Sequence, residues 1–116
     1  MAKLTMDHVI TKDQFLDLVD TAGYAIGYWA SQAEVLEDPS GDVKYIVRET
    51  GNSRCSVTPA MIEQAMVDVY MGNVDIRKDI KDSITSAIME EEYGEIDGEA
   101  ADALVQIALF GCIVYG

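Results

Sequence analysis

Hydrophobic residues recur every three or four positions in four segments of the chain, which is the spacing of an amphipathic helix. These segments are residues 12–22, 59–71, 74–90 and 98–110. The first predicted helix either ends near residue 22 or continues through Gly23 and Gly27 to Trp29. The last segment is apolar around most of its surface, so we expect that helix to be buried.

Capping residues predict where three of these helices begin. Thr11 and Gln14 have the spacing of a capping box, in which each side chain satisfies a backbone N–H of the other residue. Thr58 before Pro59 is typical of an N-cap and a first helical residue. Asp97 is expected to cap the last helix. Glycines at the expected C-terminal positions are Gly72 and Gly111.

Between the first two helices the pattern changes to that of strands. Residues 33–36, 44–50 and 54–57 are short runs with β-branched, aromatic and other apolar side chains. Residues 39–42 and 51–53 between them carry turn signals. This stretch therefore predicts three short strands joined as an antiparallel meander.

Taken together, the elements predict an α+β fold with an N-terminal helix, a small antiparallel β-meander and three C-terminal helices. The 116 residues fit a single domain, residues 1–116. The apolar segment 112–115 is expected to be docked, as an extra strand or at a subunit contact. Six methionines and the apolar last helix favour a homo-oligomer.

Acidic residues outnumber basic ones, 21 to 8, which gives a net charge of −13. This excess disfavours direct nucleic-acid binding and contact with an anionic membrane. No apolar run reaches the roughly 18 residues of a membrane span, and the N-terminus lacks the apolar core of a signal peptide. We therefore expect neither a membrane nor a nucleic acid as partner.

The few cysteine and histidine residues limit the chemistry. Cys55 and Cys112 lie far apart in the sequence, which favours two reduced thiols in a cytosolic protein over a single disulfide. His8 is the only histidine, so neither a zinc site nor a histidine-activated nucleophile is favoured. We predict no enzyme, no cofactor and no metal. An enzyme would need carboxylates such as Asp97 and Asp102 as acid and base or as metal ligands.

The basic residues are concentrated in the middle of the chain. Residues 44–81 hold six of the eight and have a net charge of +1, whereas residues 1–43 carry −6 and residues 82–116 carry −8. In one interpretation the basic residues at 77–81 pair with acidic neighbours between 75 and 82, and the others are solvated.

In the other interpretation, some of these basic residues bind an anion. Arg48 and Arg54 flank one predicted turn, and guanidinium groups bind phosphate bidentately. Thr50 and Asn52 lie in that turn, where hydroxyl and backbone N–H groups can cradle an oxyanion. These four residues are therefore candidates for a phosphate site.

Three aromatic residues lie close together near the end of the first helix: Tyr24, Tyr28 and Trp29. Core packing explains Trp29 most simply. Alternatively, Gly23 and Gly27 let a flat ring approach the backbone, and Tyr28 and Trp29 stack on a base, at about 1–3 kcal/mol per base. Together with the arginines, that alternative predicts a nucleotide-sized pocket.

An acidic segment, residues 90–99, contains six carboxylates. It is either a solvated loop leading into a helix, where acidic residues are favoured, or a row of negative charge that imitates nucleic acid. A nucleic-acid mimic would occupy the basic groove of a nucleic-acid-binding protein.

Segments near both ends of the chain are similar to a known group of proteins. They are Asp20 to Ala30 (DTAGYAIGYWA), Ile96-Asp97, Ala101-Asp102, Val105-Gln106, Phe110-Gly111 and Val114-Tyr115-Gly116. The GYWA motif and the C-terminal FG-x-x-VYG resemble a family of small, mostly unannotated phage-encoded proteins. The resemblance implies a phage gene product in the cytoplasm of the bacterial host. Small accessory phage proteins often counter host defence.

We therefore expect a phage-encoded counter-defence protein that binds and sequesters a nucleotide-derived immune signalling molecule without catalysis, in a pocket at a homo-oligomer interface. Tyr28 and Trp29 would stack on a base, and Arg48 and Arg54 would pair with phosphate. The alternative is an acidic protein-interaction or nucleic-acid-mimic inhibitor of a host defence enzyme, which accounts for the charge directly.

Overall fold

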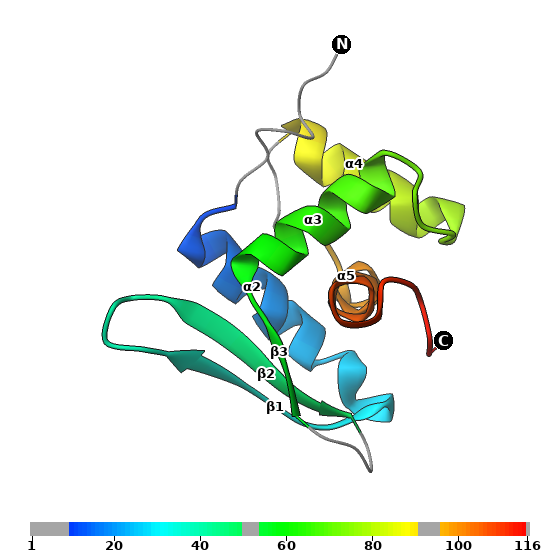
Figure 1. The fold of residues 1–116 in the computed structure, drawn as a ribbon. Coiled ribbons are helices and arrows are strands. Elements are labelled where there is room, and N and C mark those ends of the chain that lie inside the picture. The colour runs from blue at the N-terminus through cyan, green and yellow to red at the C-terminus, as the bar shows by residue number, and fades with distance from the viewer. Residues whose placement is uncertain (1–9, 50–53, 91–95, 116) are drawn as a thin grey trace.

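The computed structural model describes residues 10–49, 54–90 and 96–115. Over these ranges the chain runs from a helix through a short 3-10 turn and three strands to three further helices (Figure 1). The elements are α2 (Lys12–Gly23), η1 (Ile26–Tyr28), β1 (Ala30–Glu37), β2 (Val43–Glu49), β3 (Arg54–Val57), α3 (Pro59–Tyr70), α4 (Lys78–Glu90) and α5 (Gly98–Phe110). The fold is α+β, as the hydrophobic pattern predicts.

The three strands form one antiparallel sheet in the order β1-β2-β3. Val43, Tyr45 and Val47 of β2 are buried on the face toward the core. Lys44, Ile46 and Arg48 alternate with them on the opposite face, where Lys44 and Arg48 are exposed and Ile46 is 8% exposed. Figure 1 shows the described helices on one side of the sheet. None of the described helices covers the opposite face, which we call the open face of the sheet.

The helix α5 lies at the centre of the fold and packs against α2, α3 and α4. Its buried side chains run almost without interruption from Ala100 to Ile107. The prediction that the last helix is buried is therefore confirmed. Packing on several sides explains why its sequence has no single apolar stripe.

The capping residues also behave as predicted. Thr11 and Gln14 exchange side-chain and backbone hydrogen bonds as a capping box. Thr58 and Asp97 each accept a hydrogen bond from the backbone N–H three residues later. Gly111 ends α5 with a φ of +80°, a conformation that glycine adopts without strain.

The element boundaries agree with the prediction in part. The first helix ends at Gly23, as the shorter of its two predicted alternatives has it, and a separate 3-10 turn leads to Trp29. The strand β1 begins at Ala30 instead of residue 33. The helix α4 begins at Lys78 instead of near residue 74. Ile76 packs on the core from the connection before α4, which is why it fits the apolar spacing of that helix without belonging to it. None of the helices in the described ranges is long and apolar enough to cross a membrane.

Candidate functional site

Two polar side chains lie in the buried part of α5. Asp102 is 7% exposed and Gln106 is 1% exposed, and their spacing places them one helical turn apart. The Gln106 side-chain amide donates to Oδ1 of Asp102 at 3.0 Å. Burial of such polar groups costs free energy unless they form hydrogen bonds. Their hydrogen-bond partners therefore identify the segments that α5 holds in place.

Asp102 binds the segment that joins α2 to β1. The Tyr28 hydroxyl donates to Oδ2 at 2.6 Å, and the Trp29 indole N–H donates to Oδ1 at 2.8 Å. Together with Gln106, three uncharged donors therefore converge on one carboxylate. Within the described residues, no Lys or Arg forms an ion pair with Asp102.

Gln106 binds the C-terminal tail, residues 111–115, next to Asp102. Its Oε1 accepts hydrogen bonds from the backbone N–H groups of Val114 and Tyr115, each at 2.8 Å, and its Nε2 donates to the Tyr115 carbonyl at 3.0 Å. The tail is docked, as its apolar composition predicts, but it forms no extra strand. The reason is that the Gln106 amide takes the backbone groups that a neighbouring strand would bind.

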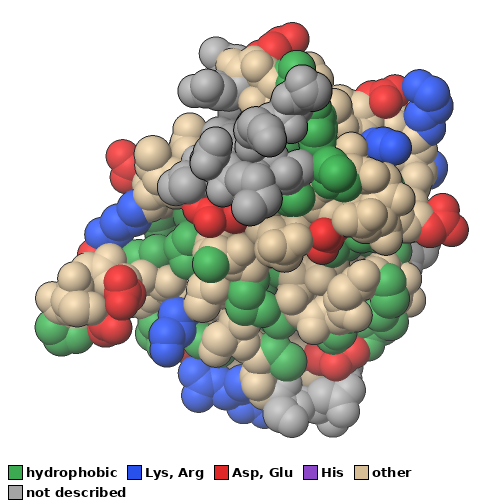
Figure 2. Space-filling view, turned by 45° about the horizontal axis from the view of Figure 1, so that its top comes forward, with side chains coloured by type: hydrophobic (Ala, Val, Ile, Leu, Met, Phe, Trp, Pro, Cys, Tyr) green, Lys and Arg blue, Asp and Glu red, His purple; other side chains and the backbone are tan. Residues whose placement is uncertain are grey.

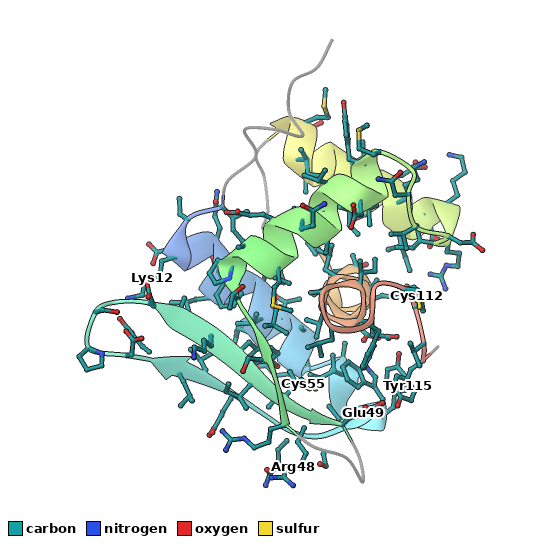
Figure 3. The ribbon with its side chains drawn as sticks, in the orientation of Figure 1. Lys12, Arg48, Glu49, Cys55, Cys112 and Tyr115 are labelled. Carbon is teal, nitrogen blue, oxygen red and sulfur yellow. The ribbon has the colours of Figure 1, made fainter. Side chains whose placement is uncertain are left out.

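Aromatic rings complete this arrangement. The Tyr115 ring stacks on Trp29 with centroids 5.3 Å apart and planes 4° from parallel, and Phe110 meets both rings edge-on. The Tyr115 hydroxyl is hydrogen-bonded to Glu49 at the end of β2 (Figure 3). This hydrogen bond, together with burial, raises the pKa of Tyr115. The tail thereby ties α5 to the sheet.

The structure corrects the stacking role expected for Trp29. Its side chain is 1% exposed and its ring is covered by Tyr115, so no ring face is open to a ligand. Tyr28 keeps a largely exposed ring, but its hydroxyl is held by Asp102. Burial and this hydrogen bond raise the pKa of Tyr28 to about 12. Trp29 therefore belongs to the core.

A cleft of about 780 Å³ opens beside this network. Tyr28, Asp102 and Gln106 contribute polar groups to its lining, and Ile76 and Arg77 approach it from the connection between α3 and α4. The other lining residues are Ala25, Asp75, Ile80, Glu99, Ala103, Ile113 and Tyr115. The cleft is thus mostly apolar with acidic groups in its lining.

Arg48 and Arg54 lie elsewhere, on the open face of the sheet. They are directly opposed in the antiparallel register of β2 and β3, so their side chains project from the same face. Figure 3 shows Arg48 pointing away from the helices. Within the described residues neither arginine forms an ion pair. The structure therefore brings these two predicted residues together.

Both arginines line a hollow of about 610 Å³. Ser31, Gln32 and Glu34 of β1 and the nearly buried Ile46 of β2 contribute to it, together with Ala33. Thr50 and Asn52, the other candidate phosphate ligands, lie outside the described residues. The predicted constellation is thus split, because Tyr28 and Trp29 adjoin α5 on the other side of the sheet.

Several other basic residues are paired with carboxylates. Arg77 binds Asp79 at 2.7 Å and Lys78 binds Asp82 at 2.8 Å, as the first interpretation of the charge pattern expects. Arg77 also binds Glu99 at 2.7 Å, which that interpretation does not include. Lys12 pairs with Glu37. Figure 2 shows Lys and Arg side chains in separate groups on the visible face rather than in one continuous basic surface.

The carboxylates considered for catalysis have other partners. Asp97 caps α5, and Asp102 accepts hydrogen bonds from three side chains. Among the residues that the structure describes, no three His, Cys, Asp or Glu side chains are grouped as a metal site would require. Half of the acidic segment 90–99, for which nucleic-acid mimicry is one interpretation, lies at 91–95, outside the described residues.

Sequence reasoning missed the roles of Asp102, Gln106 and Tyr115. The available signal was a pair of polar residues four apart in an otherwise apolar helix, since buried polar groups need partners. The segments on which the expected family resemblance rests meet at this network, because Tyr28, Trp29, Asp102, Gln106 and Tyr115 all lie in them. Comparison with models of protein families, with curated proteins and with solved structures found no match.

Proposed function

We propose that the protein binds a nucleotide-derived phosphate compound on the open face of its sheet and sequesters it without catalysis. The observation that carries this proposal is the direct opposition of Arg48 and Arg54 on β2 and β3, with no acidic partner among the described residues. Two guanidinium groups at this spacing suit bidentate contacts with phosphate oxygens.

Electrostatics supports an anionic ligand for this pair. Like charges directly opposed across a sheet destabilise it by a few tenths of a kcal/mol to about 1 kcal/mol. A bound phosphate between the two guanidinium groups would remove that repulsion. The hollow holds these two positive charges and one negative charge, that of Glu34, so it is locally positive in a chain of net charge −13.

The remaining surface of the hollow suits the uncharged part of a nucleotide. Ile46 is only 8% exposed and offers an apolar contact beside Arg48. Ser31 and Gln32 offer hydrogen-bonding groups that can contact a base or a ribose. The volume lies within the range of about 300–1,000 Å³ that is usual for small-molecule sites.

The biological setting of the proposal comes from the family resemblance. In the cytoplasm of its host, a phage protein that binds a nucleotide immune signal lowers the concentration of free signal. Binding without turnover is enough for that role, because the signal is withdrawn as soon as it is held. The exposed edge of β1, with Val35 and Leu36, supports a homo-oligomer formed by pairing with a second copy. Light scattering of the wild type and of a Val35→Lys, Leu36→Lys variant tests that assembly.

The test of the binding function is calorimetric titration with cyclic dinucleotides, cyclic mononucleotides and ADP-ribose. Loss of both guanidinium groups in an Arg48→Ala, Arg54→Ala variant should weaken binding about 100-fold or more, because hydrogen bonds to charged groups contribute about 1.5–3 kcal/mol each.

Lys44→Ala is the matched control. Lys44 projects from the same face of β2, and removing it changes the net charge by the same amount as removing one arginine. Four residues of strand place it about 13 Å from Arg48, so binding should change little. Arg48→Ala and Arg54→Ala are therefore also measured singly. If Lys44→Ala loses as much affinity as either of these, only overall charge matters, which contradicts a specific arginine site.

A further inference from the structure

We propose that the cleft beside Asp102 binds a second kind of ligand, a small molecule with an apolar body and a cationic amine. This site is separate from the arginine hollow, since the two share no lining residue. Two observations support this assignment: the uncharged hydrogen-bond partners of Asp102 and the composition of the cleft.

Asp102 is a buried carboxylate that pairs with no Lys or Arg among the described residues. Its three hydrogen-bond donors, Tyr28, Trp29 and Gln106, are all uncharged. Buried carboxylates are normally paired with a cation or a metal. Oδ1 accepts two of the hydrogen bonds and Oδ2 accepts one, so Oδ2 retains a lone pair for a further donor. A ligand ammonium in the cleft would supply both the donor and the missing charge.

The charged residues around the cleft also favour a cationic ligand. Three carboxylates line it, those of Asp75, Glu99 and Asp102, against one guanidinium, that of Arg77. Arg77 is already bound to Asp79 and Glu99, which offset its charge. The excess of negative charge attracts cations and disfavours the phosphate compound proposed for the sheet face.

The rest of the lining suits an apolar body. Ile76, Ile80 and Ile113 form apolar walls, and Ala103 leaves space beside Asp102. The volume of about 780 Å³ is that of a pocket for a small organic molecule. An amine with an aliphatic or aromatic chain would place its head at Asp102 and its body against these isoleucines.

The chain has one tryptophan, so a nitrogen-15 NMR spectrum contains a single indole N–H signal, that of Trp29. Because that N–H binds Asp102 directly, the signal reports on the proposed site. Three matched probes are titrated: 4-phenylbutylamine, its neutral analogue 4-phenylbutanol and its anionic analogue 4-phenylbutyrate.

We expect the amine to move the indole signal saturably and the alcohol to bind about tenfold or more weakly, which is the usual contribution of one charged hydrogen bond. The carboxylate should not bind. If the alcohol binds as tightly as the amine, or if the amine leaves the indole signal unmoved, the proposal is overturned.

Two variants and a control sharpen the test. Asp102→Asn keeps an acceptor oxygen but removes the charge, so the preference for the amine over the alcohol should disappear. Because Asp102 also holds the core together, Ala103→Leu provides a second route: it fills the cleft from α5 and should block both probes. Asp82→Asn removes one negative charge outside the cleft and should change nothing. Amine binding that persists in the folded Ala103→Leu variant contradicts the assignment.

Discussion

Trp29 and Asp102 are 73 positions apart in the chain, yet the indole N–H of Trp29 donates to Oδ1 of Asp102 at 2.8 Å. This hydrogen bond fixes the entry to β1 against the central helix. Replacing Asp102 with Ala leaves the buried indole N–H and an amide N–H of Gln106 without this acceptor. We expect the free energy of unfolding to fall by about 2–4 kcal/mol, because each unsatisfied buried donor costs about 1–3 kcal/mol.

Urea unfolding measures that loss. Asp75→Ala is the control, since Asp75 is an exposed residue of the same cleft and should cost less than about 0.5 kcal/mol. Similar losses in both variants would show that Asp102 has no special role in stability.

The docking of the tail depends on Gln106. Gln106→Ala removes three hydrogen bonds to the backbone of Val114 and Tyr115. We expect faster amide hydrogen exchange at both tail residues and a loss of about 1–3 kcal/mol in stability. Gln64→Ala, at an exposed position in α3, is the matched control and should alter neither. If the tail amides of Gln106→Ala exchange as slowly as those of the wild type, Gln106 does not hold the tail in place.

The hydroxyl of Tyr28 makes a pH-dependent contribution to stability. Its pKa is raised from 10.0 to about 12 by burial and by its hydrogen bond to Asp102. A raised pKa in the folded state means that the stabilisation is present in full below the unfolded pKa and is lost as the pH rises from 10.0 to about 12.

The matching measurement compares the wild type with Tyr28→Phe by urea unfolding at several pH values. The wild type should be the more stable protein near neutral pH, and its advantage should shrink between pH 10.0 and about 12. Tyr24→Phe, which removes the hydroxyl of an exposed ring, is the control variant. An advantage that grows over this interval would contradict the sign of the shift.

The arginine pair implies a conflict between stability and binding. Arg54→Glu replaces two opposed positive charges by an opposite-charge pair with Arg48, which should raise stability by about 0.2–1 kcal/mol. The same change should abolish nucleotide binding, because it places a carboxylate in the phosphate site. Thermal unfolding and calorimetry measure the two effects. A variant that is less stable than the wild type would show that the opposition carries no cost.

Local signals predicted the fold well because each acts over a few residues. The residues that begin or end a helix act on backbone groups close by in the sequence. Thr11 and Gln14 cap the start of α2, Thr58 and Pro59 begin α3, and Gly111 ends α5. The start of α4 was predicted too early because Ile76 reaches the core from a loop, and apolar spacing alone does not distinguish a loop contact from a helical one.

The candidate site was harder to predict because it depends on contacts across the fold. The opposition of Arg48 and Arg54 followed from two strands joined by a short turn, which is a local relationship. The burial of Trp29 depends on Asp102 and Tyr115, which lie more than 70 residues later. In the sequence alone, the neighbouring aromatic residues Tyr24, Tyr28 and Trp29 are therefore compatible with either a ligand-binding surface or a core. In the structure, Trp29 lies in the core.

The central claim is that the open face of the sheet holds a nucleotide-derived anion. The most direct measurement is thermal unfolding of the wild type against cyclic dinucleotides, cyclic mononucleotides and ADP-ribose derivatives. A ligand at about 100 times its Kd should stabilise the fold by about 2.7 kcal/mol, a shift of several degrees. We expect such a shift for a selective subset of these compounds, recovery of the ligand intact after heating, and loss of the shift in the Arg48→Ala, Arg54→Ala variant. No shift with any of them, or a shift that survives removal of both arginines, would contradict it.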